Sequence, residues 1–450
     1  MDKYNLKAIS PIDGRYADIT APLREYFSEF ALIKTRLMVE VEYFISLFEL
    51  KLPQLNDTIN FDLLKKIYND FSIENAIQIK EIEKITNHDV KAVEYFLKEK
   101  FDHIGLSGYK EFIHFGLTSQ DINNTAIPFL TKQALEKILI PEFKNILSKI
   151  EELSQKWKDI PMLARTHGQA ATPTTVGKEL KVFAYRLEQQ LKTLEKINYT
   201  AKFGGATGNF NAHLIAYPDI NWEKFADDFI KNSFGLQRSQ YTTQIDNYDN
   251  IAELFECIER INTVLLDFSK DMWTYISFEY FKQKISPDET GSSTMPHKIN
   301  PVDFENAEGN LEIANALLLF MAVKLPVSRM QRDLSDSTVL RNIGVAVAHT
   351  LIAAKSIMKG ISKIEICKDK IYSDLDKHWE IIAEAIQTVL RREGFSKPYE
   401  LLKQFTAGKS EISKNNILSF IENLDVNDKI KEELKKITPF NYTGTASKIH

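Results

Sequence analysis

The stretch IAELFECIERINTVLLDFSKDMWTYI, residues 251–276, carries apolar side chains at alternating intervals of three and four positions. This spacing predicts a helix of about seven turns with one continuous apolar stripe. Cys257 lies inside this helix, and we expect its thiol to pack in the core like a small apolar side chain. The stripe consists of Ile251, Leu254, Phe255, Ile258, Ile261, Leu265, Phe268, Met272 and Ile276.

Four further stretches show the same periodicity, at residues 141–158, 175–199, 303–324 and 337–360. Glycine and proline number only 17 and 14 of 450 residues, which disfavours many short strands and tight turns. Alternation typical of strands is hard to find, and helices this long usually pack in bundles. The sequence therefore predicts an all-α fold, with shorter helices in its C-terminal part.

The overall composition argues against several classes of protein. The net charge is −5 without a basic tract, so we expect no nucleic-acid partner. Cys257 and Cys367 are the only cysteines and lie far apart, which excludes a disulfide framework and a cysteine-rich metal site. The nine histidines are too widely spaced for a zinc signature. Without a signal-peptide pattern or an uncharged apolar run of about 18 residues, we expect no membrane span and a cytoplasmic protein.

The segment GSSTMPHKINP, residues 291–301, concentrates two serines, a histidine and a lysine ahead of a predicted helix. Asn300 is suited to cap that helix, with Pro301 as its first residue and Asp303 in the first turn. Helix N-termini attract carboxylates and developing anions, so the segment is suited to binding an anion. An ordinary polar loop before a capped helix explains the same pattern equally well.

Other polar segments have structural explanations beside functional ones. In TNHD, residues 86–89, either Asn87 or Asp89 could cap the following helix. The clustered Arg, Ser and Thr side chains of 329–341 suit a phosphate group, or form a solvated charged connector. GGATG, residues 204–208, is a glycine-rich turn that lacks the ending of a phosphate-binding P-loop.

Taken together, these segments resemble the fumarase/aspartase superfamily, whose signature GSSTMPHKINP matches. Within it, the chain is similar to the bacterial form of the branch that acts on succinylated purine nucleotides. Ala170 is a small departure, since a proline commonly follows THGQ in this family. The resemblance covers nearly the whole chain through DGRY (13–16), TNHDVKAVEYF (86–96), HFGLTSQDINN (114–124), RTHGQ (165–169), TTQI (242–245) and RDLSDSTVLRN (332–342).

The resemblance implies a three-domain helical subunit, with a helical domain at 1–112, a long-helix bundle at 113–363 and a C-terminal helical domain at 364–450. It also implies a homotetramer with a twenty-helix core and active sites shared between subunits. The implied reaction is β-elimination of fumarate from adenylosuccinate, giving AMP, and from succinyl-aminoimidazole-carboxamide ribotide (SAICAR), giving AICAR. No metal or organic cofactor is implied.

The family pattern assigns the catalytic roles to His167 as general acid and Ser292 as base. A histidine of ordinary pKa suits proton donation near neutral pH, whereas a serine base requires stabilisation of its alkoxide. Lys298 and Asn300 would stabilise charge on the substrate carboxylate. The residues implied to bind substrate are Arg15, Tyr16, Asn87, His88, Asp89, Thr118, Ser119, Gln244, Ser293, Lys298, Ile299, Asn300, Asn306, Arg332, Ser337, Thr338, Val339, Leu340 and Arg341.

The main alternative is another lyase of the same superfamily, such as argininosuccinate lyase, fumarase, aspartase or a cycloisomerase. His297 within MPHK and the phosphate-like segment 332–341 favour a nucleotide substrate, because fumarate and aspartate carry no phosphate. A helical scaffold without catalytic activity is a second alternative. It would not require His88, His167, Ser292 and Lys298 all to be retained.

Overall fold

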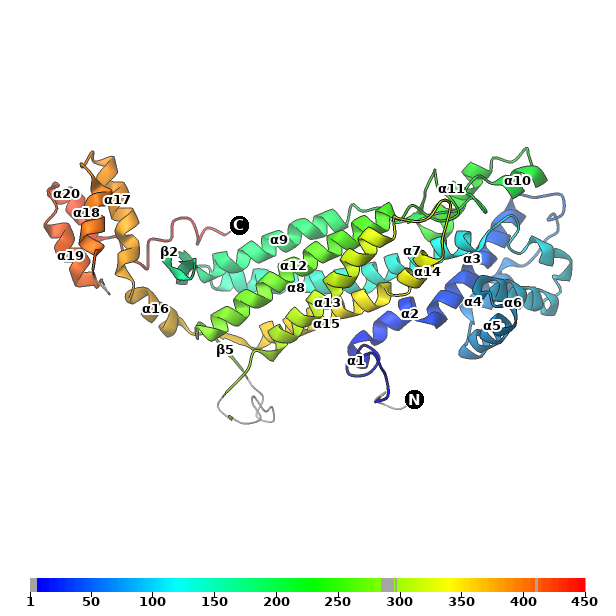
Figure 1. Ribbon diagram of the computed structural model, residues 1–450, viewed down its shortest axis with the longest axis horizontal. Helices are drawn as coiled ribbons and strands as arrows, with labels where there is room; N and C mark the ends of the chain where they lie inside the picture. The colour runs from blue at the N-terminus through cyan, green and yellow to red at the C-terminus, as the bar shows by residue number, and fades with distance from the viewer. Residues whose placement is uncertain (1–5, 285–294, 296–297, 409–411, 450) are drawn as a thin grey trace. The chain divides into compact units, whose positions relative to one another are not determined.

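A computed structural model of the chain describes residues 6–284, 295, 298–408 and 412–449 (Figure 1). The chain forms two compact units, each assembled from three segments. Unit 1 contains Met1–Phe143, Gln190–Thr263 and Gly309–Lys355, and unit 2 contains Lys144–Gln189, Val264–Glu308 and Ser356–His450. Most described residues are helical, which confirms the predicted mostly helical, multi-domain fold.

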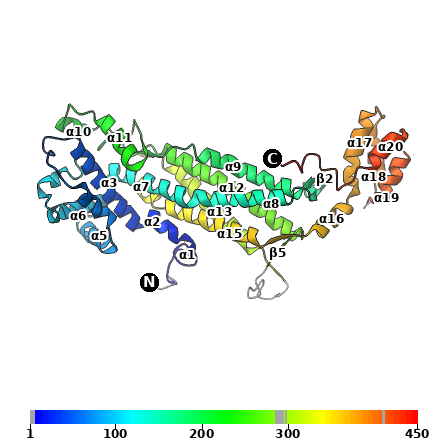
Figure 2. The same ribbon diagram turned by 180° about the vertical axis from the view of Figure 1, so that it is seen from behind.

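Unit 1 is built mainly from helices, with α3–α6 gathered beside one another in both views (Figures 1 and 2). Its elements are α1 (Ala17–Thr20), η1 (Ala21–Leu23), α2 (Arg24–Phe27), α3 (Glu29–Glu49), α4 (Phe61–Asn69), α5 (Ile73–Thr86), α6 (Asp89–His103), η2 (Ser107–Phe112), α7 (Ser119–Ala134), η3 (Leu135–Leu139), β3 (Thr200–Ala201), α10 (Asn211–Ala216), α11 (Trp222–Phe234), β4 (Gln237–Arg238) and α14 (Ser335–Leu340).

A large apolar core joins α3, α4, α6, the start of α7 and α11 in unit 1. Aromatic rings dominate its centre, where Tyr43 packs against Phe203, Phe225 and Phe229 at centroid distances of 5.5–6.1 Å. Burial of such rings is among the largest single contributions to stability in a helical domain. This core holds the N-terminal ends of α6 and α7, which carry His88, Asp89, Thr118 and Ser119.

Unit 2 combines two small sheets with a group of short C-terminal helices (Figures 1 and 2). Strands β1 and β2 form an antiparallel hairpin, and β5 pairs antiparallel with β6. A second apolar core, centred on Trp379, Ile382 and Ile386, packs the C-terminal helices together. The elements are β1 (Pro161–Thr166), β2 (Gln169–Thr175), β5 (Phe281–Gln283), β6 (Ile364–Ile366), α16 (Lys368–Asp376), η4 (Trp379–Ile382), α17 (Ala383–Arg392), α18 (Pro398–Thr406), α19 (Lys414–Glu422) and α20 (Asp428–Lys435).

Five long helices contribute residues to both units, namely α8 (Ile140–Lys156), α9 (Val176–Leu194), α12 (Asp249–Ser277), α13 (Val302–Lys324) and α15 (Ile343–Lys363). The predicted helices at 251–276 and 303–324 are confirmed within two residues at each end. Cys257 is buried inside α12, as predicted. Predicted helix 175–199 ends early, at Leu194.

Two further predicted helix boundaries are also wrong. The helix expected at 337–360 is divided into α14 and α15, because the Arg341 guanidinium and the Asn342 amide donate to the carbonyls of Ser337 and Thr338 and end the first segment. The helix expected to start at Pro141 continues upstream through the π-helical turn η3 into α7. The missing N–H of proline is therefore accommodated within a longer helical stretch.

Among the described residues, one helical stretch, Ser335–Lys363, which spans α14 and α15, is long and apolar enough to cross a membrane by length and composition alone. Within its most apolar window, 67% of the residues are buried inside the protein. Such burial is that of a core helix, because a membrane-spanning helix would present its apolar side chains to lipid.

Candidate functional site

Three of the predicted substrate residues meet in unit 1 around Arg332. Its guanidinium donates to the Gln244 amide oxygen at 3.2 Å and to the Ser337 hydroxyl at 3.4 Å. The Arg332 Nε atom is buried and has no protein partner among the described residues. A guanidinium held by two neutral groups keeps its full charge available, and an anion such as a phosphate would satisfy its remaining donors.

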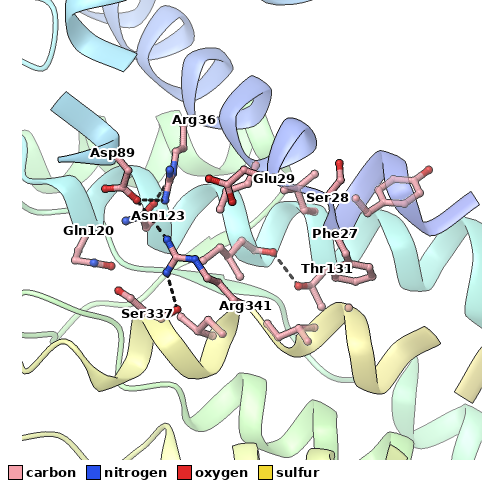
Figure 3. A pocket seen from close by; sticks show the side chains of 17 residues that line it. Phe27, Ser28, Glu29, Arg36, Asp89, Gln120, Asn123, Thr131, Ser337 and Arg341 are labelled. Atoms are coloured by element: carbon pink, nitrogen blue, oxygen red, sulfur yellow. Dashed lines mark hydrogen bonds and ion pairs between the residues drawn. The ribbon is translucent and has the colours of Figure 1, made fainter. Parts of the chain in front are cut away.

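A pocket of about 160 Å³ lies beside this cluster, between α2, α3, α7, α14 and α15 (Figure 3). Its polar wall contains Arg36, Asp89, Asn123, Ser337 and Arg341, which project toward one another in Figure 3. Its apolar wall contains Phe27, Leu32, Ile127, Leu130 and Leu340.

Arg36 fixes the position of Asp89 within that pocket. This buried guanidinium donates to the Asp89 carboxylate at 2.7 Å and to the Asn123 side chain at 2.8 Å. Arg341 approaches the same carboxylate at 3.7 Å. Burial alone would raise the pKa of Asp89, but the charge and hydrogen bond of Arg36 outweigh it and lower that pKa. Asp89 is therefore ionised at neutral pH and orients both arginines.

The helix caps predicted near Asn87 and Asp89 are wrong by one residue. His88 is the N-cap of α6, and its Nδ1 atom accepts a hydrogen bond from the Lys91 backbone at 3.1 Å. Asn87 ends α5 in the left-handed conformation, with φ of 48°. The His88 ring is thereby fixed as a hydrogen-bond acceptor at Nδ1, which also lies 3.9 Å from the carboxylate of the pocket residue Asp89, and the side chain is half exposed.

Thr118 and Ser119 are held by a buried ion pair. Asp121 accepts hydrogen bonds from the Thr118 backbone at 2.8 Å and from the Lys202 ammonium at 2.7 Å, and neither charged side chain is exposed. The backbone N–H groups of Gly204 and Gly205 donate to the same carboxylate. The glycine-rich turn 204–208 therefore surrounds a protein carboxylate, which agrees with its structural interpretation. Burial lowers the pKa of Lys202, and Asp121 opposes that effect.

The loop before Thr118 contains a second buried ion pair. His114 lies 2.6 Å from Glu40, which is fully buried, and His114 itself has a left-handed backbone with φ of 58°. Burial works against charge on His114, but Glu40 outweighs it and raises the pKa of His114. The ion pair therefore stabilises the strained backbone of His114, which lies shortly before α7.

His167 lies in unit 2 at the turn of the β1–β2 hairpin. The strands pair up to Thr166 and Gln169, so His167 and Gly168 form a two-residue turn, with φ of 53° and 75°. Left-handed conformations at both positions are required by this turn type. The His167 side chain is exposed. The hairpin was not predicted, since the sequence shows no clear alternation typical of strands.

The signature segment is described only in part. Ser292 and Ser293 lie outside the described residues, as does His297. Lys298 is exposed, whereas Ile299 and Asn300 are half-buried. The helix begins at Val302, so the predicted cap at Asn300 is wrong by one residue, and the carbonyl of Pro301 accepts the first helical hydrogen bonds. Asp303, in the first turn as expected, is paired with Lys359 and Lys363.

The remaining predicted substrate residues are distributed over both units. Asn306 lies on α13 in unit 2 and accepts a hydrogen bond from Ser356 at 2.8 Å. Arg15 is exposed just before α1 in unit 1, beside Tyr16. On α14 and after it, Thr338 is exposed, whereas Val339 and Leu340 are buried and can contribute only backbone atoms or packing.

Sequence reasoning missed the polar residues that support these positions, above all Arg36, Asp121, Lys202, Tyr248 and Asp336. The sequence shows charged residues inside apolar helices, such as Arg36 in α3, but it does not show which partner lies against them. No group of three or more His, Cys, Asp or Glu side chains within the described ranges is arranged to hold a metal ion.

Comparisons with known proteins identify the family of this chain over most of its length. Residues 14–314 match the family described as "Lyase", and residues 328–443 match the family described as "Adenylosuccinate lyase C-terminal". The chain is 56% identical to the adenylosuccinate lyase of Dictyostelium discoideum, over 98% of this chain and 97% of that protein. It is 48% identical to the adenylosuccinate lyase of Escherichia coli strain K12, over 99% of this chain and 98% of that protein.

Solved structures with low sequence identity share the fold. The 3-carboxy-cis,cis-muconate lactonizing enzyme from Pseudomonas putida superposes with a TM-score of 0.76 at 20% identity, covering 95% of this chain and 94% of that one. A fumarate lyase from Mesorhizobium sp. BNC1 superposes with a TM-score of 0.75 at 18% identity, covering 95% and 96%. These likenesses agree with the mostly helical, multi-domain fold of this chain.

Proposed function

This chain belongs to the adenylosuccinate lyase family, and on that premise we propose that it releases fumarate from adenylosuccinate, giving AMP, and from SAICAR, giving AICAR. The observation that carries the proposal is 48% to 56% identity with relatives of that name over nearly the full length. The match of the C-terminal residues 328–443 favours this reaction over the argininosuccinate lyase alternative.

The elimination breaks a carbon–nitrogen bond. A base removes the proton from the carbon next to a substrate carboxylate, an acid protonates the departing nitrogen, and the remaining electron pair forms the double bond of fumarate. We assign the acid to His167, whose ring is exposed at a hairpin turn and can face a substrate there. The base remains assigned to Ser292 by family analogy.

Negative charge that builds on the substrate carboxylate requires positive potential nearby. In this proposal Lys298 supplies most of it, with Asn300 as a hydrogen-bond donor. At the N-terminus of α13, Glu305 partly offsets the helix dipole, whereas the charge of Asp303 is paired with Lys359 and Lys363. Because Lys298 is exposed, its ammonium group can reach the carboxylate without losing buried contacts.

The nucleotide phosphate is assigned to Arg332, Ser337 and Arg341, with Arg15 and Tyr16 as further ligands. Arg332 has an unsatisfied buried donor, and Arg341 is half-exposed beside the pocket in Figure 3. Gln244, Thr118 and Ser119 would bind the succinyl group or the purine, with Asn87, His88 and Asp89 orienting it.

We also propose a homotetramer whose active sites are shared between subunits, in a cytoplasmic protein of the three domains predicted above. Five large apolar side chains on α13 are exposed, namely Val302, Ile313, Leu319, Phe320 and Val323, which supports a protein interface along that helix. Both cysteines are free thiols, as is usual in a reducing compartment.

The reaction is tested by mixing the protein with adenylosuccinate and following the change in ultraviolet absorbance, with AMP and fumarate identified by chromatography. Argininosuccinate serves as the parallel substrate. Turnover of adenylosuccinate alone is expected. Turnover of argininosuccinate without turnover of adenylosuccinate would reject the proposal.

Sharing of active sites is tested with two inactive variants, His167→Ala and Ser292→Ala. Mixed tetramers should regain part of the activity, because some sites receive one intact residue from each parent. The exchange of subunits is verified by sedimentation or native mass spectrometry of differently tagged chains. Mixed tetramers that stay inactive would contradict the shared-site arrangement.

A further inference from the structure

The loop between Gln244 and α12 places one tyrosine hydroxyl between two helices. The Tyr248 hydroxyl donates a hydrogen bond to the Asp336 carboxylate at 2.8 Å and accepts one from the Asn124 amide at 2.9 Å. Tyr248 and Asp336 are only 3% and 4% exposed, so neither side chain can reach a substrate directly. Burial and the neighbouring Asp336 hold the pKa of Tyr248 well above its usual value, and the hydroxyl therefore keeps its proton.

Each partner of this hydroxyl belongs to a segment assigned to substrate binding. Asn124 lies on α7, which begins at Ser119. Tyr248 follows Gln244 by four positions, and Asp336 directly precedes Ser337 on the short helix α14. The hydroxyl thus joins the three segments through hydrogen bonds that solvent cannot replace, because the site is buried.

The surrounding loop fixes the tyrosine strongly. Tyr248 has a left-handed backbone with φ of 62°, which is costly for a bulky side chain. Asp246 compensates by accepting from the Tyr248 backbone at 3.2 Å and from the Ser239 hydroxyl at 2.7 Å. The Asp246 backbone in turn donates to the Asn124 side chain at 2.9 Å. A strained residue held by so many partners indicates that its position matters.

We propose that Tyr248 is a positioning residue, which holds α14 in the orientation that directs Ser337 and Arg341 toward the nucleotide phosphate. The inference rests on the proposed function, since it needs that phosphate as the ligand of α14. Helix α14 has only six residues and ends at the break before α15, so few helical hydrogen bonds hold it in place. The bond from Tyr248 to Asp336 supplies a fixed point within its first turn.

The test compares Tyr248→Phe with Tyr68→Phe, a matched control in the same unit. Tyr68 is also buried and donates to a carboxylate, that of Glu42, at 2.6 Å. Loss of the Tyr248 hydroxyl should raise the inhibition constant of AMP about tenfold and leave that of fumarate, which has no phosphate, within about twofold. Tyr68→Phe should leave both constants unchanged. Equal increases for AMP and fumarate, or none for AMP, would overturn the proposal.

A second pair of variants keeps the test decisive if Tyr248→Phe folds poorly. Asp336→Asn retains an oxygen that can accept from Tyr248, and AMP inhibition should stay within about threefold of the wild-type value. Asp336→Ala should match Tyr248→Phe, and the double variant should be no weaker in AMP binding than either single one. An Asp336→Ala variant with normal AMP inhibition would refute the role of Tyr248.

The wild-type chain is measured first in every series. A wild-type chain that leaves adenylosuccinate unchanged would reject the proposed function, whatever the variants do. A wild-type chain that turns over adenylosuccinate while Tyr248→Phe retains normal AMP binding, measured by calorimetry, would reject only the positioning role.

Discussion

Helix α14 and the β1–β2 hairpin carry two sets of predicted active-site residues, and their surroundings differ sharply. The residues on and around α14 are supported by buried groups, including the Tyr248–Asp336 hydrogen bond and, behind Thr118, the Asp121–Lys202 ion pair. His167 lies exposed at a two-residue turn of unit 2. The proposed binding residues are therefore preorganised by buried polar interactions inside one unit, whereas the hairpin of His167 is held by strand pairing and by partly exposed contacts such as that of Arg165 with Asp374.

The largest expected effect is a loss of catalytic rate without a loss of stability, at the hairpin turn. His167→Asn should lower kcat by about 10³-fold, because the general acid is lost. The thermal midpoint should stay within about 2 °C, since asparagine tolerates the left-handed backbone and no buried contact is removed. Steady-state assays and differential scanning calorimetry measure the two quantities. A variant that keeps more than a tenth of the activity would remove His167 from the mechanism.

The next largest effect is a loss of stability, at the buried Asp121–Lys202 ion pair. Asp121→Asn leaves the Lys202 ammonium buried without a counter-charge and should lower the free energy of unfolding by roughly 3–5 kcal/mol. Urea denaturation measures the change. Asp228→Asn is the control, because the Lys224–Asp228 pair is exposed and should contribute nothing measurable. Similar losses in the two variants would show that burial does not distinguish these pairs.

Protonation of the buried His213 should make the stability of unit 1 depend on pH. Burial lowers the pKa of His213 to about 4 from an unfolded value of 6.5. As the pH falls, the unfolded chain binds this proton before the folded chain does. The free energy of unfolding that depends on neutral His213 is therefore complete above pH 6.5. It is lost as the pH falls toward 4, by up to roughly 3 kcal/mol. His213→Gln should flatten the pH dependence of unfolding in that window. An unchanged slope would mean that other groups dominate acid unfolding.

The smallest effect compares two glycines with left-handed backbones. Gly168→Ala in the hairpin places a methyl group in open space and should cost about 1 kcal/mol of backbone strain. Gly116→Ala has the same strain, and its methyl group would also lie 2.7 Å from the His213 ring. Thermal midpoints should therefore fall further for Gly116→Ala. Equal midpoints would indicate that the His213 ring moves aside freely.

The long helices were predictable because their apolar stripes repeat over many turns, as at 251–276. The break between α14 and α15 was not, since apolar spacing continues across it while side chains of Arg341 and Asn342 end the first helix. The hairpin had one usable signal, the His-Gly pair at 167 and 168, which suits a turn with two left-handed residues.

Motif resemblance identified the side chains expected to contact the substrate, but not the residues behind them. Lys202 and Asp121 are separated by 81 positions, and Tyr248 and Asp336 by 88. A single sequence does not show which residues form such pairs, because each residue alone is only a polar position in a loop or helix. Only the folded chain shows that these groups are buried and joined.

The left-handed turn at His167 also has a genetic consequence. Histidine codons change to asparagine or aspartate codons by one base, and both residues tolerate this backbone conformation better than most others. Alleles that encode asparagine or aspartate at this position should therefore produce stable, abundant subunits. In a cell with two gene copies, the proposed homotetramer would then form from variant and normal subunits together, so the phenotype would be set by mixed oligomers and not by loss of protein.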